Sequence, residues 1–106
     1  MGNKEFIKFL DKFNNERLRM RISVKNGKVT DVVVQYETFI TGKWHAVVRY
    51  DCSHGFFHRD VLFPNGQKEK QVIEFDSLET ALSYSEQDIK DRWEFYRNRY
   101  KKRIKK

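Results

Sequence analysis

The chain has 106 residues, enough for one hydrophobic core and too few for two domains. Hydrophobic residues make up 39% and aromatic residues 15% of the sequence, which excludes a disordered chain despite 35% charged residues. No apolar run approaches the roughly 20 residues that span a bilayer, and one cysteine excludes an internal disulfide. We therefore expect a single cytoplasmic domain over residues 1–106 with no membrane partner.

The net charge of +7 is concentrated at the C-terminus. Residues 1–89 hold thirteen basic and thirteen acidic residues, whereas residues 90–106 hold nine basic and two acidic residues. A localised basic block is typical of proteins that bind polyanions, most often nucleic acid, and otherwise acts as a solubilising tail. The residues of this basic helical extension predicted to bind nucleic acid are Arg97, Arg99, Lys101, Lys102, Arg103, Lys105 and Lys106.

The N-terminal segment shows a helical pattern. Phe6, Phe9, Leu10 and Phe13 follow the i, i+3, i+4, i+7 spacing of one apolar stripe. The spacing predicts a helix over residues 3 to about 14.

The middle of the chain alternates apolar and polar residues with the period of two that is typical of strands. Three glycine-containing segments separate these runs: K-N-G at 25–27, I-T-G at 40–42 and P-N-G at 64–66. Each fits a three-residue loop closed by a left-handed glycine, which keeps the more apolar side of neighbouring strands on one face. The pattern predicts an antiparallel meander of five strands at about 17–25, 28–39, 43–51, 56–63 and 67–75.

A second apolar stripe predicts a long C-terminal helix. The helix begins at Asp76 or Ser77, with Glu79 as a capping-box partner, and runs to about Arg103 because no Gly or Pro follows Gly66. The predicted fold is α+β, with both helices covering one face of the five-stranded sheet.

The segment R-Y-D-C-S-H-G-F-F-H-R-D at 49–60 concentrates the groups that carry chemistry. A four-residue loop at 52–55 would place Arg49 opposite His58 on the polar face of the sheet. Imidazole and carboxylate groups can transfer protons, and a guanidinium can hold a phosphate through two hydrogen bonds. The candidate catalytic residues are His58, Arg49, Asp51, His54 and Asp60.

Other interpretations of this segment remain open. Arg49 can instead form a structural ion pair with Asp51 or Asp60. A Cys52 nucleophile lacks an accompanying helix N-terminus. Strand alternation permits a metal site formed by His45, Asp51, His58 and Asp60, but no recognised ligand signature is present, so neither a metal nor another cofactor is expected. Apolar residues also share the polar face, so that Phe39, Val47 and Phe56 are candidate interface residues.

The segment G-K-W-H-A-V-V-R-Y-D-C-S-H-G-F-F-H-R-D at 42–60, together with P-N-G-Q-K-E-K at 64–70, resembles a family of short, uncharacterised prokaryotic proteins. The R-Y-D strand followed by histidines also resembles, more remotely, the TumE-type toxins of toxin–antitoxin pairs. The long basic C-terminal helix departs from the toxin pattern. The toxin resemblance implies a ribonuclease and an antitoxin partner.

Two functions follow as expectations. The first is a small RNA-directed protein, with a metal-independent ribonuclease of toxin type as its enzymatic form. The second is a non-catalytic module whose polar sheet face binds an acidic protein such as an antitoxin, or a second copy of the chain.

Overall fold

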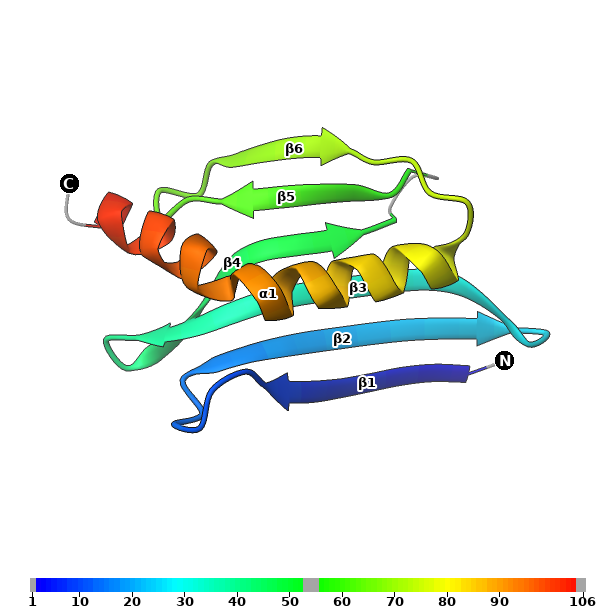
Figure 1. Ribbon diagram of the computed structural model, residues 1–106, viewed down its shortest axis with the longest axis horizontal. Helices are drawn as coiled ribbons and strands as arrows, with labels where there is room; N and C mark the ends of the chain where they lie inside the picture. The colour runs from blue at the N-terminus through cyan, green and yellow to red at the C-terminus, as the bar shows by residue number, and fades with distance from the viewer. Residues whose placement is uncertain (1, 53–55, 105–106) are drawn as a thin grey trace.

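The structure is a computed structural model that describes residues 2–52 and 56–104. Its elements are β1 (Gly2–Phe9), β2 (Glu16–Lys25), β3 (Lys28–Ile40), β4 (Lys43–Asp51), β5 (His58–Leu62), β6 (Lys68–Val72) and α1 (Leu78–Ile104). The six strands form one antiparallel sheet in sequence order, and α1 crosses one face of it (Figure 1). This arrangement confirms the α+β fold with its meander and long C-terminal helix, and adds a sixth strand.

The two faces of the sheet have different surroundings. We call the side that packs against α1 the helix face; it carries Leu18, Val34 and Tyr50, all buried. The opposite side, the open face, carries the row Arg19, Gln35 and Arg49, which are cross-strand partners in neighbouring strands. Since α1 is the only helix among residues 2–52 and 56–104, no helix of the described chain covers the open face.

The predicted N-terminal helix is wrong, because this segment forms β1. The strand pairs with the outer edge of β2 from Gly2 opposite Val24 to Phe9 opposite Arg17. Pairing satisfies the backbone groups along that edge of β2, which a helix would leave without partners. The apolar stripe that suggested a helix remains largely outside the core, with Phe9 49% and Phe13 71% exposed.

Two of the three predicted loops are shorter than expected. The first turn pairs Lys25 with Lys28, and its two central residues, Asn26 and Gly27, both have positive φ (53° and 77°). The second turn has the same form between Ile40 and Lys43. Both are therefore two-residue type I′ turns, whose twist suits antiparallel strands.

The third loop is confirmed as a three-residue connection. Phe63 N–H donates to the Gln67 carbonyl over 2.9 Å, and Gly66 N–H donates to the Phe63 carbonyl over 3.0 Å. Gly66 has a φ of +90°, which is the left-handed conformation that this loop requires.

β-Bulges compensate for the two shorter turns. One extra residue, Thr30, lies in β3 opposite β2, and another, Val47, lies in β4 opposite β3. A two-residue turn in place of a three-residue loop exchanges the faces of the strand that follows it, and the extra residue of the bulge exchanges them back. Side chains beyond each bulge therefore lie on the face that the sequence predicts. Between the second turn and its bulge, Trp44 lies on the open face instead of in the core.

The helix is fixed to the sheet along most of its length. Ser77 Oγ accepts a hydrogen bond from Thr80 N–H over 3.1 Å and so caps the N-terminus, whereas Glu79 accepts from Val29 N–H of the sheet instead of closing a capping box. Residues 90–104 continue to pack on the sheet, with Tyr100 only 7% exposed. Within the described chain, no helix is both long and apolar enough to cross a membrane.

Candidate functional site

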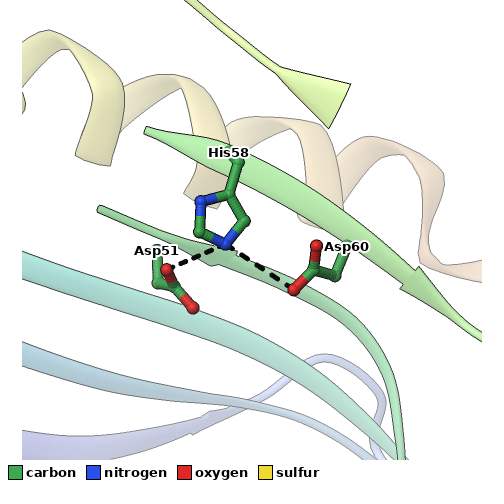
Figure 2. Close-up of side chains that lie close together, drawn as sticks. All are labelled: Asp51, His58 and Asp60. Carbon is green, nitrogen blue, oxygen red and sulfur yellow. Dashed lines mark ion pairs between the residues drawn. The ribbon is translucent and has the colours of Figure 1, made fainter. Parts of the chain in front are cut away.

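An Asp–His–Asp cluster lies on the open face, where β4 pairs with β5. Asp51 is the cross-strand partner of His58, and Arg49 is the partner of Asp60. The sequence-based register is therefore wrong by two residues, although all four side chains stay on the predicted face because a two-residue shift preserves parity. Figure 2 shows the two carboxylates on either side of the imidazole.

The imidazole of His58 faces both carboxylates through one atom. Its Nε2 lies 3.0 Å from Asp51 Oδ1 and 3.6 Å from Asp60 Oδ2 (Figure 2). The three residues are only 3–5% exposed. Burying ionisable groups costs free energy unless each group has a partner of opposite charge or a hydrogen bond. The cluster is therefore either a fixed ion network or a ligand site.

Two cations adjoin the cluster. Arg49 Nε donates to Asp51 Oδ2 over 2.9 Å, and Lys68 Nζ lies 3.6 Å from Asp60 Oδ2. Asp60 Oδ1 is buried and has no hydrogen-bond partner within the described part of the chain. Asp60 is consequently the less well satisfied of the two carboxylates.

A groove of about 380 Å³ runs beside the cluster across β1 to β4. Its lining residues include three arginines from two strands together with polar and apolar side chains: Glu5, Phe6, Ile7, Arg19, Met20, Arg21, Val33, Gln35 and Arg49. Arg49 belongs to both sites, because its Nη1 donates to Gln35 Oε1 over 3.2 Å while its Nε holds Asp51. Arg49 therefore connects the groove to the buried cluster beside it.

Aromatic residues lie at one end of this surface. The guanidinium of Arg17 lies 3.8 Å from the centre of the Trp44 ring, and Phe39 packs edge-on against the same ring at 5.2 Å. Phe39 is 41% exposed on this face, and its role as an interface residue stays a prediction. Sequence reasoning missed Trp44 here, because only the bulge at Val47 turns it toward the open face.

Other predicted residues occupy different places. Val47 is buried in the core and is not available as an interface residue, whereas Phe56 is 61% exposed. His45 faces the helix, where it contacts Tyr100 of α1, with 3.3 Å between Nδ1 and the hydroxyl. The bulge explains both displaced side chains. His54 lies outside the described residues.

Cys52 has the environment of an unreactive thiol. Burial, and then its hydrogen bond to Asp31 Oδ1 over 3.0 Å, raise the pKa of the thiol. A nucleophilic cysteine requires the opposite shift. This observation supports the initial interpretation that Cys52 is not a nucleophile.

The basic residues of the C-terminal helix are partly engaged in packing. Arg97 lies 3.7 Å from the buried Glu16 carboxylate, and Arg103 lies 4.0 Å from the ring centre of Phe63. Lys101 and Lys102 are exposed. Arg99 lies 5.6 Å from the centre of the Phe95 ring, and Lys105 and Lys106 lie outside the described residues.

A buried network that sequence reasoning did not identify joins the sheet to the helix. Asp88 Oδ2 accepts hydrogen bonds from the hydroxyls of Tyr50 (2.7 Å) and Tyr96 (2.6 Å). Arg59 Nη1 donates to the Tyr96 hydroxyl over 3.2 Å, which explains an arginine on the helix face. Arg59 occupies a strand position at which the alternation predicts an apolar residue, and this mismatch was the one sequence signal for the network.

The fold and site define an α+β protein with a meander of six strands, one covering helix and a buried carboxylate–imidazole cluster on the uncovered face. The chain belongs to the family of a domain of unknown function, DUF7718, whose model matches residues 1–106. No curated protein and no solved structure matches the chain.

Proposed function

We propose that this protein binds single-stranded RNA on the open face of its sheet. The observation that carries the proposal is the groove lined by Arg19, Arg21 and Arg49 beside the aromatic end of the same face. Guanidinium groups bind phosphates through two hydrogen bonds, and exposed aromatic rings stack on unpaired bases. The combination suits a flexible strand whose bases and phosphates are both accessible.

The charged groups of the groove are available to different degrees. Arg19 and Arg21 are exposed, and Arg19 has only a long contact of 3.7 Å to Glu37. Arg49 is already bonded to Asp51 and Gln35. The first two arginines would therefore supply most of the electrostatic attraction, and Arg49 would fix the position of a phosphate.

The basic end of α1 plays a secondary role in this proposal. The helix and the groove lie on opposite faces of the sheet, so one short strand does not reach both directly. The proposal therefore places RNA binding at the groove and not at the basic residues of the helix. Lys101 and Lys102 would add a weaker, non-specific contact to a longer RNA.

Matched pairs of substitutions test the proposal. We expect Arg19→Ala/Arg21→Ala to weaken binding of a fluorescein-labelled 12-nucleotide RNA by at least about tenfold and to reduce the log–log salt slope by about 1.4. Lys101→Ala/Lys102→Ala removes the same charge from the helix and should change the affinity less than about threefold. Fluorescence anisotropy at several salt concentrations measures both quantities. The reverse order of effects, or no binding by the unaltered protein, would contradict the proposal.

Cleavage of the bound RNA is the enzymatic form of this proposal. The support is that His58, a group able to transfer protons, adjoins the groove through Arg49 and Asp51. Its burial and its contact with Asp51 favour a fixed imidazole over a mobile one. Gel analysis of the same RNA after incubation distinguishes binding with cleavage from binding without it. Cleavage that is lost in His58→Gln would assign a catalytic role to His58, whereas intact RNA would support a protein that only binds RNA.

Protein binding is the second candidate function. It is favoured by large apolar side chains exposed on the open face, among them Ile7 (48%), Phe9 (49%) and Phe39 (41%). An acidic partner or a second copy could cover them. Sedimentation velocity at increasing protein concentration distinguishes this function: a dimer that Phe39→Ser converts to monomer would favour a self-binding surface over an RNA site.

A further inference from the structure

We infer that Asp51, His58 and Asp60 form a binding site for one divalent transition-metal ion of the Mn²⁺ or Zn²⁺ type. The inference goes beyond RNA binding and does not depend on it. It also revises the expectation that no metal is present, which rested on the lack of a recognised ligand signature in the sequence. The strand register brings together ligands that are seven and two residues apart in the chain.

The spacing of the three ligand atoms matches a shared ion. Two atoms that each lie about 2.1 Å from one metal are separated by roughly 3.0 Å at a ligand–metal–ligand angle of 90° and by roughly 3.6 Å at 120°. The distances from His58 Nε2 are 3.0 Å to Asp51 Oδ1 and 3.6 Å to Asp60 Oδ2. The two carboxylate oxygens also lie within 4.8 Å of each other, so side-chain adjustment alone can bring all three groups onto one ion.

Asp60 provides an independent indication of a ligand. The residue is 97% buried, and Figure 2 shows its carboxylate turned toward the imidazole. The separation of 3.6 Å from His58 Nε2 is too long for a hydrogen bond, and Oδ1 has no hydrogen-bond partner among residues 2–52 and 56–104. A buried carboxylate in this state is costly, and coordination to a cation would satisfy it.

The surrounding residues are consistent with metal binding. Arg49 donates a hydrogen bond to Asp51 Oδ2. This bond fixes the orientation of the carboxylate, so that its Oδ1 points toward His58. One imidazole nitrogen and two carboxylate oxygens favour borderline divalent ions over Ca²⁺, which prefers six to eight oxygen ligands. A metal on Nε2 would occupy the atom that faces both carboxylates, so proton transfer through that atom and metal binding are mutually exclusive roles.

Metal titration of the full chain tests the inference. After removal of metals with EDTA, we expect calorimetry with MnCl₂ to give one ion per chain, and His58→Gln and Asp60→Asn each to weaken binding by at least about tenfold. The matched controls are His45→Gln, an imidazole that contacts Tyr100, and Asp91→Asn, an exposed carboxylate of α1. Both controls should bind Mn²⁺ with the affinity of the unaltered chain. Absence of binding, or equal binding by Asp60→Asn, would overturn the inference.

Two further measurements keep the test decisive if the ligand variants fail to fold. In nitrogen-15 spectra of the histidine side chains, ZnCl₂ should shift the Nε2 signal of His58 and leave that of His45 unchanged. Lys68→Gln removes a half-exposed cation 3.6 Å from Asp60 Oδ2 and should tighten Mn²⁺ binding about two- to fivefold. Unchanged His58 signals, or weaker binding by Lys68→Gln, would show a structural ion network instead of a metal site.

Discussion

At the scale of single residues, the Asp88 carboxylate holds the helix to the sheet. It accepts hydrogen bonds from one tyrosine of β4 and one of α1, and Arg92 lies 3.8 Å from its other oxygen. Burial, followed by the hydrogen bond to Asp88, raises the pKa of Tyr50 above its ordinary value, and the same causes raise the pKa of Tyr96 to about 12. The phenols therefore remain protonated in the folded protein at pH values where an unfolded chain ionises them.

This difference predicts a loss of stability in alkali. A phenol with a folded-state pKa above its unfolded value of about 10 binds its proton more tightly in the native state. Its contribution is fully present below pH 10 and is lost as the pH rises from about 10 to about 12. We expect the free energy of unfolding from urea titrations to fall over this range. In Tyr96→Phe the fall should be smaller, and an equally steep fall in that variant would contradict the role assigned to Tyr96.

The candidate site was only partly predictable from these residues. Alternation placed Arg49, Asp51, His58 and Asp60 correctly on one face, because parity survives a register shift of two residues. The exact partners depend on the length of the connection after Asp51, which residue patterns do not determine. The Asp88 network involves residues 38 and 8 positions apart, so local sequence contains no signal for it beyond an arginine in an apolar position.

At the scale of elements, the bulges decide which side chains reach each face. The turn at Thr41 and Gly42 is one residue shorter than the predicted loop, and Val47 supplies the missing residue within β4. As a result Val47 and His45 face the helix, while Trp44 reaches the aromatic end of the open face. Alternation alone identifies strands and turns but cannot locate a shorter turn with its compensating bulge, since a longer turn without a bulge places the residues beyond the bulge on the same faces.

Deletion of Val47 tests this account of β4. Without the extra residue, the segment 43–46 must exchange its faces or break its pairing with β3, which moves Trp44 toward the core and His45 toward solvent. We expect the deletion variant to lose cooperative thermal unfolding. Val47→Ala keeps the bulge and should cost only roughly 1–3 kcal/mol. A deletion variant as stable as Val47→Ala would show that the bulge does not determine the orientation of the side chains.

The N-terminal segment shows a second limit at the scale of elements. Its apolar residues satisfy a helical period, yet pairing with β2 determines its structure. The side chain of Lys8 then contacts Glu86 of α1 over 2.6 Å. Although burial opposes it, the hydrogen bonds from Lys8 and Lys90 lower the pKa of Glu86. Long-range pairing of this kind overrides a local pattern because it satisfies a whole row of backbone groups.

At the scale of the whole molecule, the apolar core and the arginine-lined groove lie on opposite faces of one sheet. The helix face holds the apolar core, and the open face presents the arginine-lined groove, the aromatic end and the Asp–His–Asp cluster. The distribution of net charge along the sequence predicted a polyanion-binding C-terminal helix. The structure shows that two of its arginines, Arg97 and Arg103, contact Glu16 and Phe63 of the protein itself.

The most direct test of RNA binding at the open face is a side-chain NMR titration with an unlabelled single-stranded RNA. Arginine Nε–Hε groups and methyl groups belong to side chains that project from one face of the sheet, so their signals report on that face. Backbone amides lie within the sheet and do not distinguish its faces. We predict shifts for Arg19 and Arg21 and for the methyl groups of Ile7, with the buried helix-face methyl groups of Val32 and Val34 unchanged. Shifts confined to Arg97, Arg99 and Arg103 would place the RNA on the helix and contradict the account.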